Sequence, residues 1–232
     1  MEDQRRRIME EHAGHRKRMK SRFLHYGLSN FDDHNILELL LFYAQPRKDT
    51  NALAHRLMET FGSLDAVFEA PPEALMKVEG IGESAAVLIH LVPEAARRYR
   101  IAKETPGNII SSSEDVGRYM IPRFLNCRGE AVYLICLDPK RRVLGCHELS
   151  SGSPTSVSVT VRQIVEIALT QNAAAVILAH NHPNGLALPS PEDNASTQRI
   201  RNALALVNIP LLDHIIVSGE DFVSMADSGL LI

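Results

Sequence analysis

The stretch AAAVILAHNHPNGLALPSPED, residues 173–193, decides the fold of the region around it. Its first part, Ala173–Ala179, is a continuous apolar run, which is typical of a central strand covered on both faces. The residues Pro183-Asn184-Gly185 then turn the chain. Ser190 and Pro191 follow as start signals of a helix, the first as N-cap and the second at the first helical position. A buried strand, a turn and a helix in this order predict an α/β domain.

Three side chains of this stretch form a candidate metal site. Residues two apart on extended backbone project to the same side, so His180 and His182 can aim both imidazoles at one point. The returning loop can place Asp193, in the first turn of the next helix, beside them. Two imidazoles and one carboxylate, with a fourth position left to water, are the ligands of a catalytic rather than a structural zinc ion.

Each part of this pattern also has an ordinary structural explanation. The sequence Ser190-Pro-Glu-Asp193 is a helix-start signal of capping-box type that needs no metal. A single histidine near a strand end is more often a hydrogen-bonded structural residue than a ligand. The combination of the parts, rather than either one, indicates the metal site.

The rest of the second half alternates between strands and helices. Strands are expected at 131–137, 143–149 and 211–217, with the turn Asp138-Pro139-Lys140 between the first two, and helices at 159–171 and 190–207. The loop-like residues 105–113 mark the expected boundary, which gives domains at 1–102 and 103–232.

The first half has helical patterns throughout. A buried helix is expected at 35–44, ending near Pro46, and the next one begins after Asp49 or Thr50. Its apolar face and its end are formed by Ala54, Leu57, Met58, Phe61 and Gly62. A short helix follows Pro71-Pro72, and another runs from Glu83 towards Arg97-Arg98 with an interruption expected at Pro93.

Composition narrows the class of protein. The chain has 232 residues, of which 45% are apolar and 23% charged, with a formal net charge of −3. No apolar run is long enough to span a membrane, and no secretory signal is readable. The cysteines Cys127, Cys136 and Cys146 fit neither a disulfide framework nor a zinc knuckle, which indicates free thiols in a reducing compartment. A cytoplasmic protein without membrane contact is therefore expected.

The spacing His-x-His, seven residues, Ser, two residues, Asp resembles the signature of the JAMM (MPN+) metalloproteases. Together with the residues around it and the later segment Leu212-Asp-His-Ile-Ile-Val217, it is similar to the RadC family within that superfamily. The resemblance covers nearly the whole chain. It implies an α/β fold, a JAMM/MPN-like αβα sandwich related to the deaminases, preceded by a small all-α helix-hairpin-helix domain.

The resemblance also implies a mechanism. Glu130, immediately before the strand at 131–137, matches the glutamate that contacts the zinc-bound water in JAMM enzymes. Ser190 is the expected donor to the oxyanion. The implied activity is that of a metallopeptidase-like zinc hydrolase, which cleaves peptide or isopeptide-like amide bonds of a peptide or protein substrate through a water activated by one zinc ion. Without the resemblance Glu130 would be an exposed carboxylate at a strand entry, and Glu148 competes with it.

Two further histidines are not assigned as ligands. His214 follows Asp213 in the segment that carries the family likeness, and contact with a ligand is one interpretation. We expect instead a satisfied polar residue at the start of a buried strand. His147 is likewise left out.

The residues Val78-Glu-Gly80-Ile81-Gly82-Glu-Ser-Ala-Ala86 match the helix-hairpin-helix pattern. Its glycines permit a tight turn, and the amides of Gly80, Ile81 and Gly82 and of the helix start are candidates to hold a DNA phosphate without reading bases. Glu83 and Ser84 weaken this interpretation, because DNA-binding versions often carry a basic residue there.

Residues 1–30 form a basic arm, which contains eight basic and four acidic residues. The basic ones are Arg5, Arg6, Arg7, Arg16, Lys17, Arg18, Lys20 and Arg22. The arm is either a nucleic-acid contact or a solvated helix. The alternative function is accordingly a DNA-binding repair or recombination accessory protein whose metal site is structural or vestigial.

A base deaminase is rejected because His-x-Glu and Pro-Cys-x-x-Cys are missing, and an HNH nuclease is a poor match.

Overall fold

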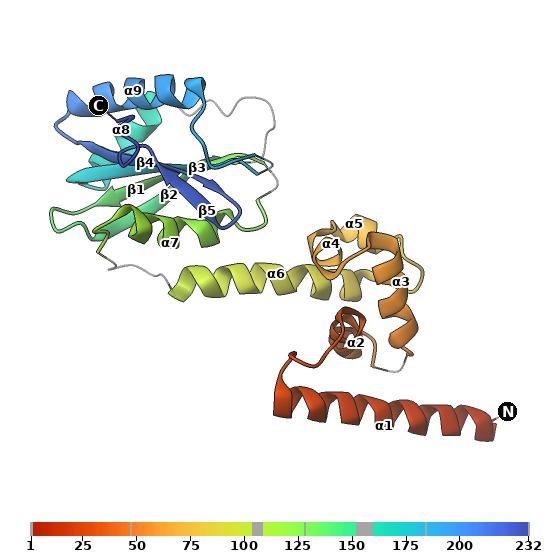
Figure 1. Ribbon diagram of the computed structural model, residues 1–232. Coiled ribbons are helices and arrows are strands. Elements are labelled where there is room, and N and C mark those ends of the chain that lie inside the picture. The colour runs from red at the N-terminus through yellow and green to blue at the C-terminus, as the bar shows by residue number, and fades with distance from the viewer. Residues whose placement is uncertain are drawn as a thin grey trace. The chain divides into compact units, whose positions relative to one another are not determined.

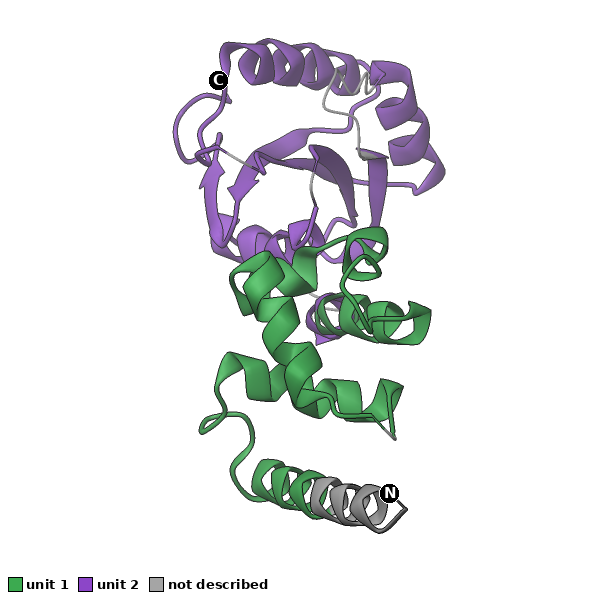
Figure 2. Cartoon of the chain, turned by 90° about the vertical axis from the view of Figure 1, so that its right-hand side faces the viewer, with its two compact units in different colours: residues 1–96 green, residues 97–232 purple. Residues whose placement is uncertain are grey.

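The computed structural model describes residues 2–46, 48–103, 109–127, 129–151, 160–183 and 185–231, with the backbone alone at 2–13 and 151. The expected loop at 105–108, the helix start at Val159, the turn residue Asn184 and the side chains of Arg5, Arg6 and Arg7 lie outside the described residues. The chain divides into two compact units, residues 1–96 and 97–232 (Figure 2). The boundary expected between 102 and 103 lies near the end of the helix in which this division falls, and its position stays a prediction.

The N-terminal unit is helical, as expected. Its helices are α1 (Glu2–Tyr26), α2 (Asp33–Ala44), α3 (Asn51–Phe61), α4 (Leu64–Glu69), α5 (Pro72–Leu75) and α6 (Glu83–Lys103), the last of which continues into the second unit. One apolar core forms where α2, α3 and α6 pack together, and it includes Leu37, Leu57 and Ile89, all fully buried. Pro93 lies inside α6 without ending it, contrary to the expected interruption, because a proline removes a single helical hydrogen bond.

Gly62 and Gly80 are among the glycines of this unit that close turns with left-handed backbone. Gly62 ends α3 with φ of +89°, and Gly80 precedes α6 with φ of +91°. A Cβ at Gly80 would lie 2.5 Å from Cδ2 of Leu53, whereas nothing lies within 4 Å of a Cβ at Gly62. The two positions share the backbone requirement and differ in the space around them.

Replacing Gly80 by alanine is therefore expected to destabilise the chain more than replacing Gly62 does. Both variants incur a backbone cost of about 1–3 kcal/mol. Gly80→Ala adds about 1–3 kcal/mol for the contact with Leu53. The urea midpoints of the two variants measure the difference. Equal losses would contradict a tight approach of Leu53 to the hairpin.

The C-terminal unit is built on one mixed sheet. Its elements after α6 are α7 (Ser113–Phe124), β1 (Ala131–Leu137), β2 (Val143–Ser151), α8 (Val161–Thr170), β3 (Ala175–Asn181), α9 (Pro191–Ala205), β4 (Leu211–Ser218) and β5 (Asp221–Ser224). The strand order is β2-β1-β3-β4-β5, in which β3 and β4 are parallel and the other neighbours antiparallel (Figure 1).

Helices cover both faces of this sheet. The residues Ile177 and Ala179 of β3 pack on the side of α7, and Val176 and Leu178 pack on the side of α8 and α9. Figure 1 shows α7 on one side of the sheet and α8 and α9 on the other. The unit is an αβα sandwich, which confirms the expected fold class. The side chain at position 180 shares the face of Leu178 and points towards α9.

The strands and helices expected in the second half are present with small shifts at their ends. Three elements lie outside those expectations: α4, α7 and β5. Helix α4 has six residues, too few for a clear period, and β5 is a four-residue edge strand. Helix α7 has 12 residues but contains Gly117 and Pro122, which are poor helix formers. None of the helices within the described residues is long and apolar enough to cross a membrane.

Candidate metal centre

The two histidines of the His-x-His pair lie at the carboxyl end of β3. The strand ends at Asn181, and the amide of His182 donates to the carbonyl of Val217 on β4 at 2.8 Å, which keeps the chain extended one residue further. Because the backbone stays extended, the rings of His180 and His182 lie on the same side, with centroids 4.8 Å apart.

The third side chain comes from the start of α9. Ser190 caps this helix, and its hydroxyl oxygen accepts from the amide of Asp193 at 3.1 Å. The carboxylate of Asp193 then turns to the histidines, with Oδ1 3.2 Å from Nε2 of His180 and Oδ2 3.6 Å from Nε2 of His182. The ligand atoms of these three residues all lie within 4.8 Å of one another.

The donors and acceptors of this group fit a bound cation. Nδ1 of His182 lies 3.0 Å from the carbonyl oxygen of Leu186, and because a carbonyl only accepts, this nitrogen carries the hydrogen. The lone pair of His182 Nε2 therefore faces Nε2 of His180 at 2.9 Å, a distance that needs a proton or a cation between the rings.

The group has the size of a site for one metal ion, since its ligand atoms all lie within 4.8 Å of one another. Ligand atoms bound to a tetrahedral zinc ion at about 2.0–2.1 Å lie about 3.3 Å from one another. Here the two imidazole Nε2 atoms lie 2.9 Å apart, Oδ1 of Asp193 lies 3.2 Å from His180, and the other oxygen, Oδ2, lies 3.6 Å from His182. Three protein ligands leave a fourth position for water or substrate.

The protonation states of Asp193 and His214 affect whether the site can bind a cation. Burial opposes the charge of Asp193, but the proximity of His180 and the hydrogen bonds from Ser190 outweigh it and hold the pKa of this carboxyl below its usual range. Burial lowers the pKa of His214, whose Nε2 lies 2.8 Å from Nδ1 of His180, to about 3. A carboxylate that stays ionised and a neighbouring ring that stays neutral both favour a cation between the ligands.

The hydroxyl of Ser190 is engaged with Asp193. It donates to Oδ2 of Asp193 at 2.7 Å, and the amide of Ser190 donates to the same oxygen at 2.8 Å. The hydrogen that Ser190 is predicted to offer to an oxyanion is thus directed at the carboxylate. The predicted role requires this hydroxyl to turn, and it stays a prediction.

The same capping box occurs a second time without histidines. At the start of α7, Ser112 accepts from the amide of Asp115 at 3.2 Å, and the carboxylate of Asp115 accepts from the amide of Ser112. The local geometry of Ser190 and Asp193 is therefore not special to a metal site. The presence of two histidines beside it distinguishes the group at Ser190 and Asp193 from the one at Ser112 and Asp115.

This duplication gives a matched pair of variants. Ser190→Ala and Ser112→Ala should each lose about 1 kcal/mol of stability through the lost cap. Only Ser190→Ala should also weaken zinc binding, by about 10-fold, because only that serine orients a ligand. Thermal unfolding and a zinc titration of both proteins measure the two effects. Equal zinc affinities would show that Ser190 acts as a cap alone.

The position of Glu130 follows from extending the strand register. Val132 pairs with His180 in the antiparallel register of β1 and β3, and continuing this register by two residues predicts Glu130 level with His182. Val132 packs on the side of α8 and α9, so Glu130 belongs to the same face. The side-chain amide of Asn181 accepts from the amide of Ala131 at 2.7 Å and donates to the carbonyl of Gly129 at 3.2 Å. Asn181 therefore fixes the backbone on both sides of Glu130.

The competing glutamate lies on the other face of the sheet. Glu148 accepts a hydrogen bond from the hydroxyl of Tyr133 at 2.8 Å, and Tyr133 belongs to the core next to α7. The sheet therefore separates Glu148 from His180. The choice of Glu130 rests on register and face, because its carboxylate is not part of the described group of three ligand side chains.

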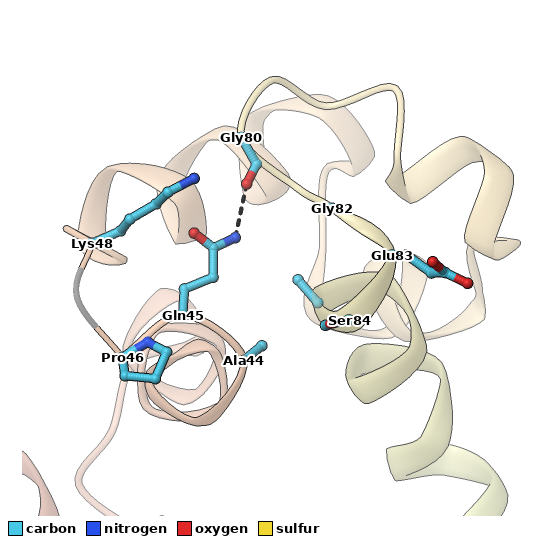
Figure 3. A pocket seen from close by; sticks show the side chains of 9 residues that line it. Ala44, Gln45, Pro46, Lys48, Gly80, Gly82, Glu83 and Ser84 are labelled. Atoms are coloured by element: carbon cyan, nitrogen blue, oxygen red, sulfur yellow. Dashed lines mark hydrogen bonds between the residues drawn. The ribbon is translucent and has the colours of Figure 1, made fainter.

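The hairpin of the N-terminal unit forms an open pocket at the start of α6 (Figure 3). Gln45 Nε2 donates to the carbonyl of Gly80 at 2.7 Å, and Lys48 lies on the same side as Gln45, whereas Glu83 points away from both. Ile81 is buried, and its amide donates to Val78. Of the three predicted residues, Ile81 thus serves packing, and phosphate contact by Gly80 and Gly82 stays a prediction.

Part of the basic arm has structural partners inside the N-terminal unit. Arg16 donates to the carbonyls of Gln45 and Lys48, which follow α2. The side chains of Lys20 and Arg22 lie over the rings of Tyr43 and Phe31 respectively. These three contacts favour the interpretation of α1 as a packed helix over that of a free basic tail.

No local sequence pattern indicated the contacts that Thr197 and Asn181 make. His214 was expected as a satisfied polar residue rather than as a contact of a ligand; it is satisfied, but one of its two partners is the candidate ligand His180 and the other is Thr197. Its position in the middle of a buried strand was the available signal. The partners of its ring depend on how α9 packs against β4, and this packing cannot be predicted from a local sequence pattern.

Comparison with known proteins identifies relatives over nearly the full length. The family described as RadC-like JAB domain matches residues 110–230, and the family described as UPF0758 N-terminal matches residues 11–87. A UPF0758 protein of Polaromonas sp. is 36% identical over 215 residues, which cover 92% of this chain and 96% of that protein. A UPF0758 protein of Nitrosococcus oceani is 36% identical over 93% of this chain and 96% of that protein. One of Vibrio cholerae is 36% identical over 90% of this chain and 94% of its own length.

These matches span both units, and the matched RadC-like region contains all three side chains of the candidate metal centre. The chain belongs to the RadC family.

Proposed function

We propose that this protein is a zinc-dependent hydrolase that cleaves peptide or isopeptide-like amide bonds. The observation that carries the proposal is the convergence of His180, His182 and Asp193 within 4.8 Å, at the carboxyl end of β3 and the start of α9. Ligands in open α/β sheets commonly bind at such strand ends. The assignment of the chain to a family with a JAB domain supports the same conclusion.

The residues of the site have distinct tasks in this reaction. His180, His182 and Asp193 would hold the ion. A bound zinc ion supplies a water of lowered pKa and polarises the substrate carbonyl. Glu130 accepts a proton from the attacking water at its carboxylate and returns it to the leaving amine.

Ser190 assists at the carbonyl oxygen of the substrate. Its hydroxyl donates to this oxygen as negative charge develops there. When it turns, Oδ2 of Asp193 keeps the hydrogen bond from the amide of Ser190 at 2.8 Å. The ligand therefore stays oriented while the hydroxyl acts on the substrate.

The test is hydrolysis under control of the metal. The full chain is incubated with a peptide library and with isopeptide-linked lysine substrates, before and after removal of metal by a chelator. Cleavage should disappear with the chelator and return with added zinc. Zinc-bound protein that cleaves none of these amides would contradict the proposal.

One observation favours a second function, contact with DNA through the N-terminal unit. The amides at the start of α6, next to Lys48 in the pocket of Figure 3, offer donors to a phosphate. Binding of duplex DNA at several salt concentrations tests this function. Lys48→Gln should weaken binding and lower the salt slope by about 1, whereas Lys140→Gln, in the turn between β1 and β2, should not. Binding that does not depend on salt would contradict phosphate contact.

A further inference from the structure

We propose that Thr197 and His214 are positioning residues that hold the ring of His180 with Nε2 free for the metal. Together with His180 and the backbone of Asp193, they form a series of hydrogen bonds in which the donor and the acceptor of each bond can be assigned. The inference rests on the metal-binding part of the proposed function. It concerns residues outside the ligand set, on α9 and β4.

This series of hydrogen bonds connects two of the proposed ligands, His180 and Asp193. Nδ1 of His180 lies 2.8 Å from Nε2 of His214, and Nδ1 of His214 lies 2.6 Å from the hydroxyl of Thr197. This hydroxyl lies 2.6 Å from the carbonyl oxygen of Asp193. Thr197 is 2% exposed and His214 5% exposed, so water does not compete for these hydrogen bonds.

The direction of each hydrogen follows from the carbonyl of Asp193. This oxygen has no hydrogen, so Thr197 must donate to it. The single hydroxyl hydrogen is thereby used, and the hydrogen between Thr197 and His214 must come from Nδ1 of His214. A metal-bound His180 uses the lone pair of its Nε2, so its hydrogen lies on Nδ1 and is donated to Nε2 of His214, 2.8 Å away. Nε2 of His180, on the far side of the ring, is left for the metal.

The members of this series are themselves fixed in place. His214 lies opposite Leu178 in the parallel register of β3 and β4. Its amide donates to the carboxylate of Asp213 at 2.7 Å, and the same carboxylate accepts from Ser224 and Ala226. The backbone of His214 is therefore anchored on the turn after β5, and its ring reaches His180 without freedom to shift.

The ring of His182 is also oriented with Nε2 towards the metal site, but by a single hydrogen bond to the backbone. Its Nδ1 donates to the carbonyl of Leu186, four residues further along the loop. A ring bonded to a nearby carbonyl needs no further partner, whereas His180 lies inside the sheet and obtains its acceptor from β4 and α9. The two ligands thus use different supports for the same orientation.

Loss of such a supporting hydrogen bond lowers the affinity of a metal site by about 10- to 100-fold. Without the acceptor, the ring of His180 can take the other tautomer, in which Nε2 carries the hydrogen and cannot bind. Zinc affinity, rather than turnover, is therefore the direct readout of the proposed role.

The experiment measures zinc dissociation constants of the full-length protein by competition with a chromophoric chelator. The variants are His214→Leu, Thr197→Val and Thr197→Ser. His214→Leu should bind zinc about 10- to 100-fold more weakly, and Thr197→Val about 10-fold more weakly. Thr197→Ser keeps the hydroxyl and should bind like the wild type, which separates the hydrogen bond from packing.

Nitrogen-15 NMR of the histidine rings gives a second readout that packing alone would not move. In the zinc-bound wild type, the hydrogen of His180 should reside on Nδ1. If His214→Leu does not fold, Thr197→Val carries the test, because it replaces a hydroxyl by a methyl group of similar size. Wild-type affinity in Thr197→Val, or a hydrogen on Nε2 of His180, would overturn the proposal. Wild-type protein that binds no zinc would overturn the proposed function together with it.

Discussion

His182→Ala is expected to bind zinc about 100- to 1,000-fold more weakly than the wild type. Structural zinc sites with four ligands gain about 10–16 kcal/mol, so one ligand contributes about 2.5–4 kcal/mol. His182 is the ligand best suited to the test, because its ring lies at the rim and is 19% exposed. Its removal leaves no large cavity, and the fold should be retained.

The control for this variant is a histidine outside the site. His25 lies near the end of α1, where its ring bonds the carbonyl of Ser21. His25→Ala should bind zinc like the wild type. Isothermal titration or chelator competition measures both variants. Retention of full zinc affinity in His182→Ala would show that the ligand set is wrong.

Glu130→Gln is expected to abolish hydrolysis while zinc remains bound. Glutamine keeps the shape of the side chain but cannot accept a proton, and loss of a general base lowers turnover by about 10²- to 10⁴-fold. Because Glu130 is not among the three ligands, the zinc affinity should change little.

The matched control is Glu148→Gln, the competing glutamate on the far face of the sheet. It should keep the turnover of the wild type. The two variants are compared on a substrate cleaved by the wild-type protein, with zinc content measured in parallel. Equal loss in both, or a larger loss in Glu148→Gln, would refute the role of Glu130.

The sequence predicted those features of the fold that depend on local patterns. The apolar run before His180 became the buried strand β3, and the signals at Ser190 and Pro191 became the cap and first residue of α9. Hydrophobic periodicity and helix capping depend on residues close together in the sequence, so these elements could be predicted from the sequence alone. The helix α7 begins with the same capping signal at Ser112, but without an apolar run of clear period before it.

The convergence of the ligands was predictable, but the contacts behind it were not. Spacing and extended backbone place His180 and His182 together, whatever the rest of the fold does. The contact between Thr197 and His214 depends on the parallel pairing of β3 with β4 across α9. The face occupied by Glu148 depends on the register of β1 with β2. Such contacts follow from tertiary packing, which no local pattern encodes.

The central claim is that His180, His182 and Asp193 share one zinc ion. Anomalous diffraction at the zinc edge, from crystals of the full chain grown with zinc, tests it most directly. We predict one peak at about 2.0–2.2 Å from Nε2 of each histidine and from the carboxylate of Asp193. A zinc peak bound elsewhere, with His180 still hydrogen-bonded to Asp193 and no density between the rings, would contradict it.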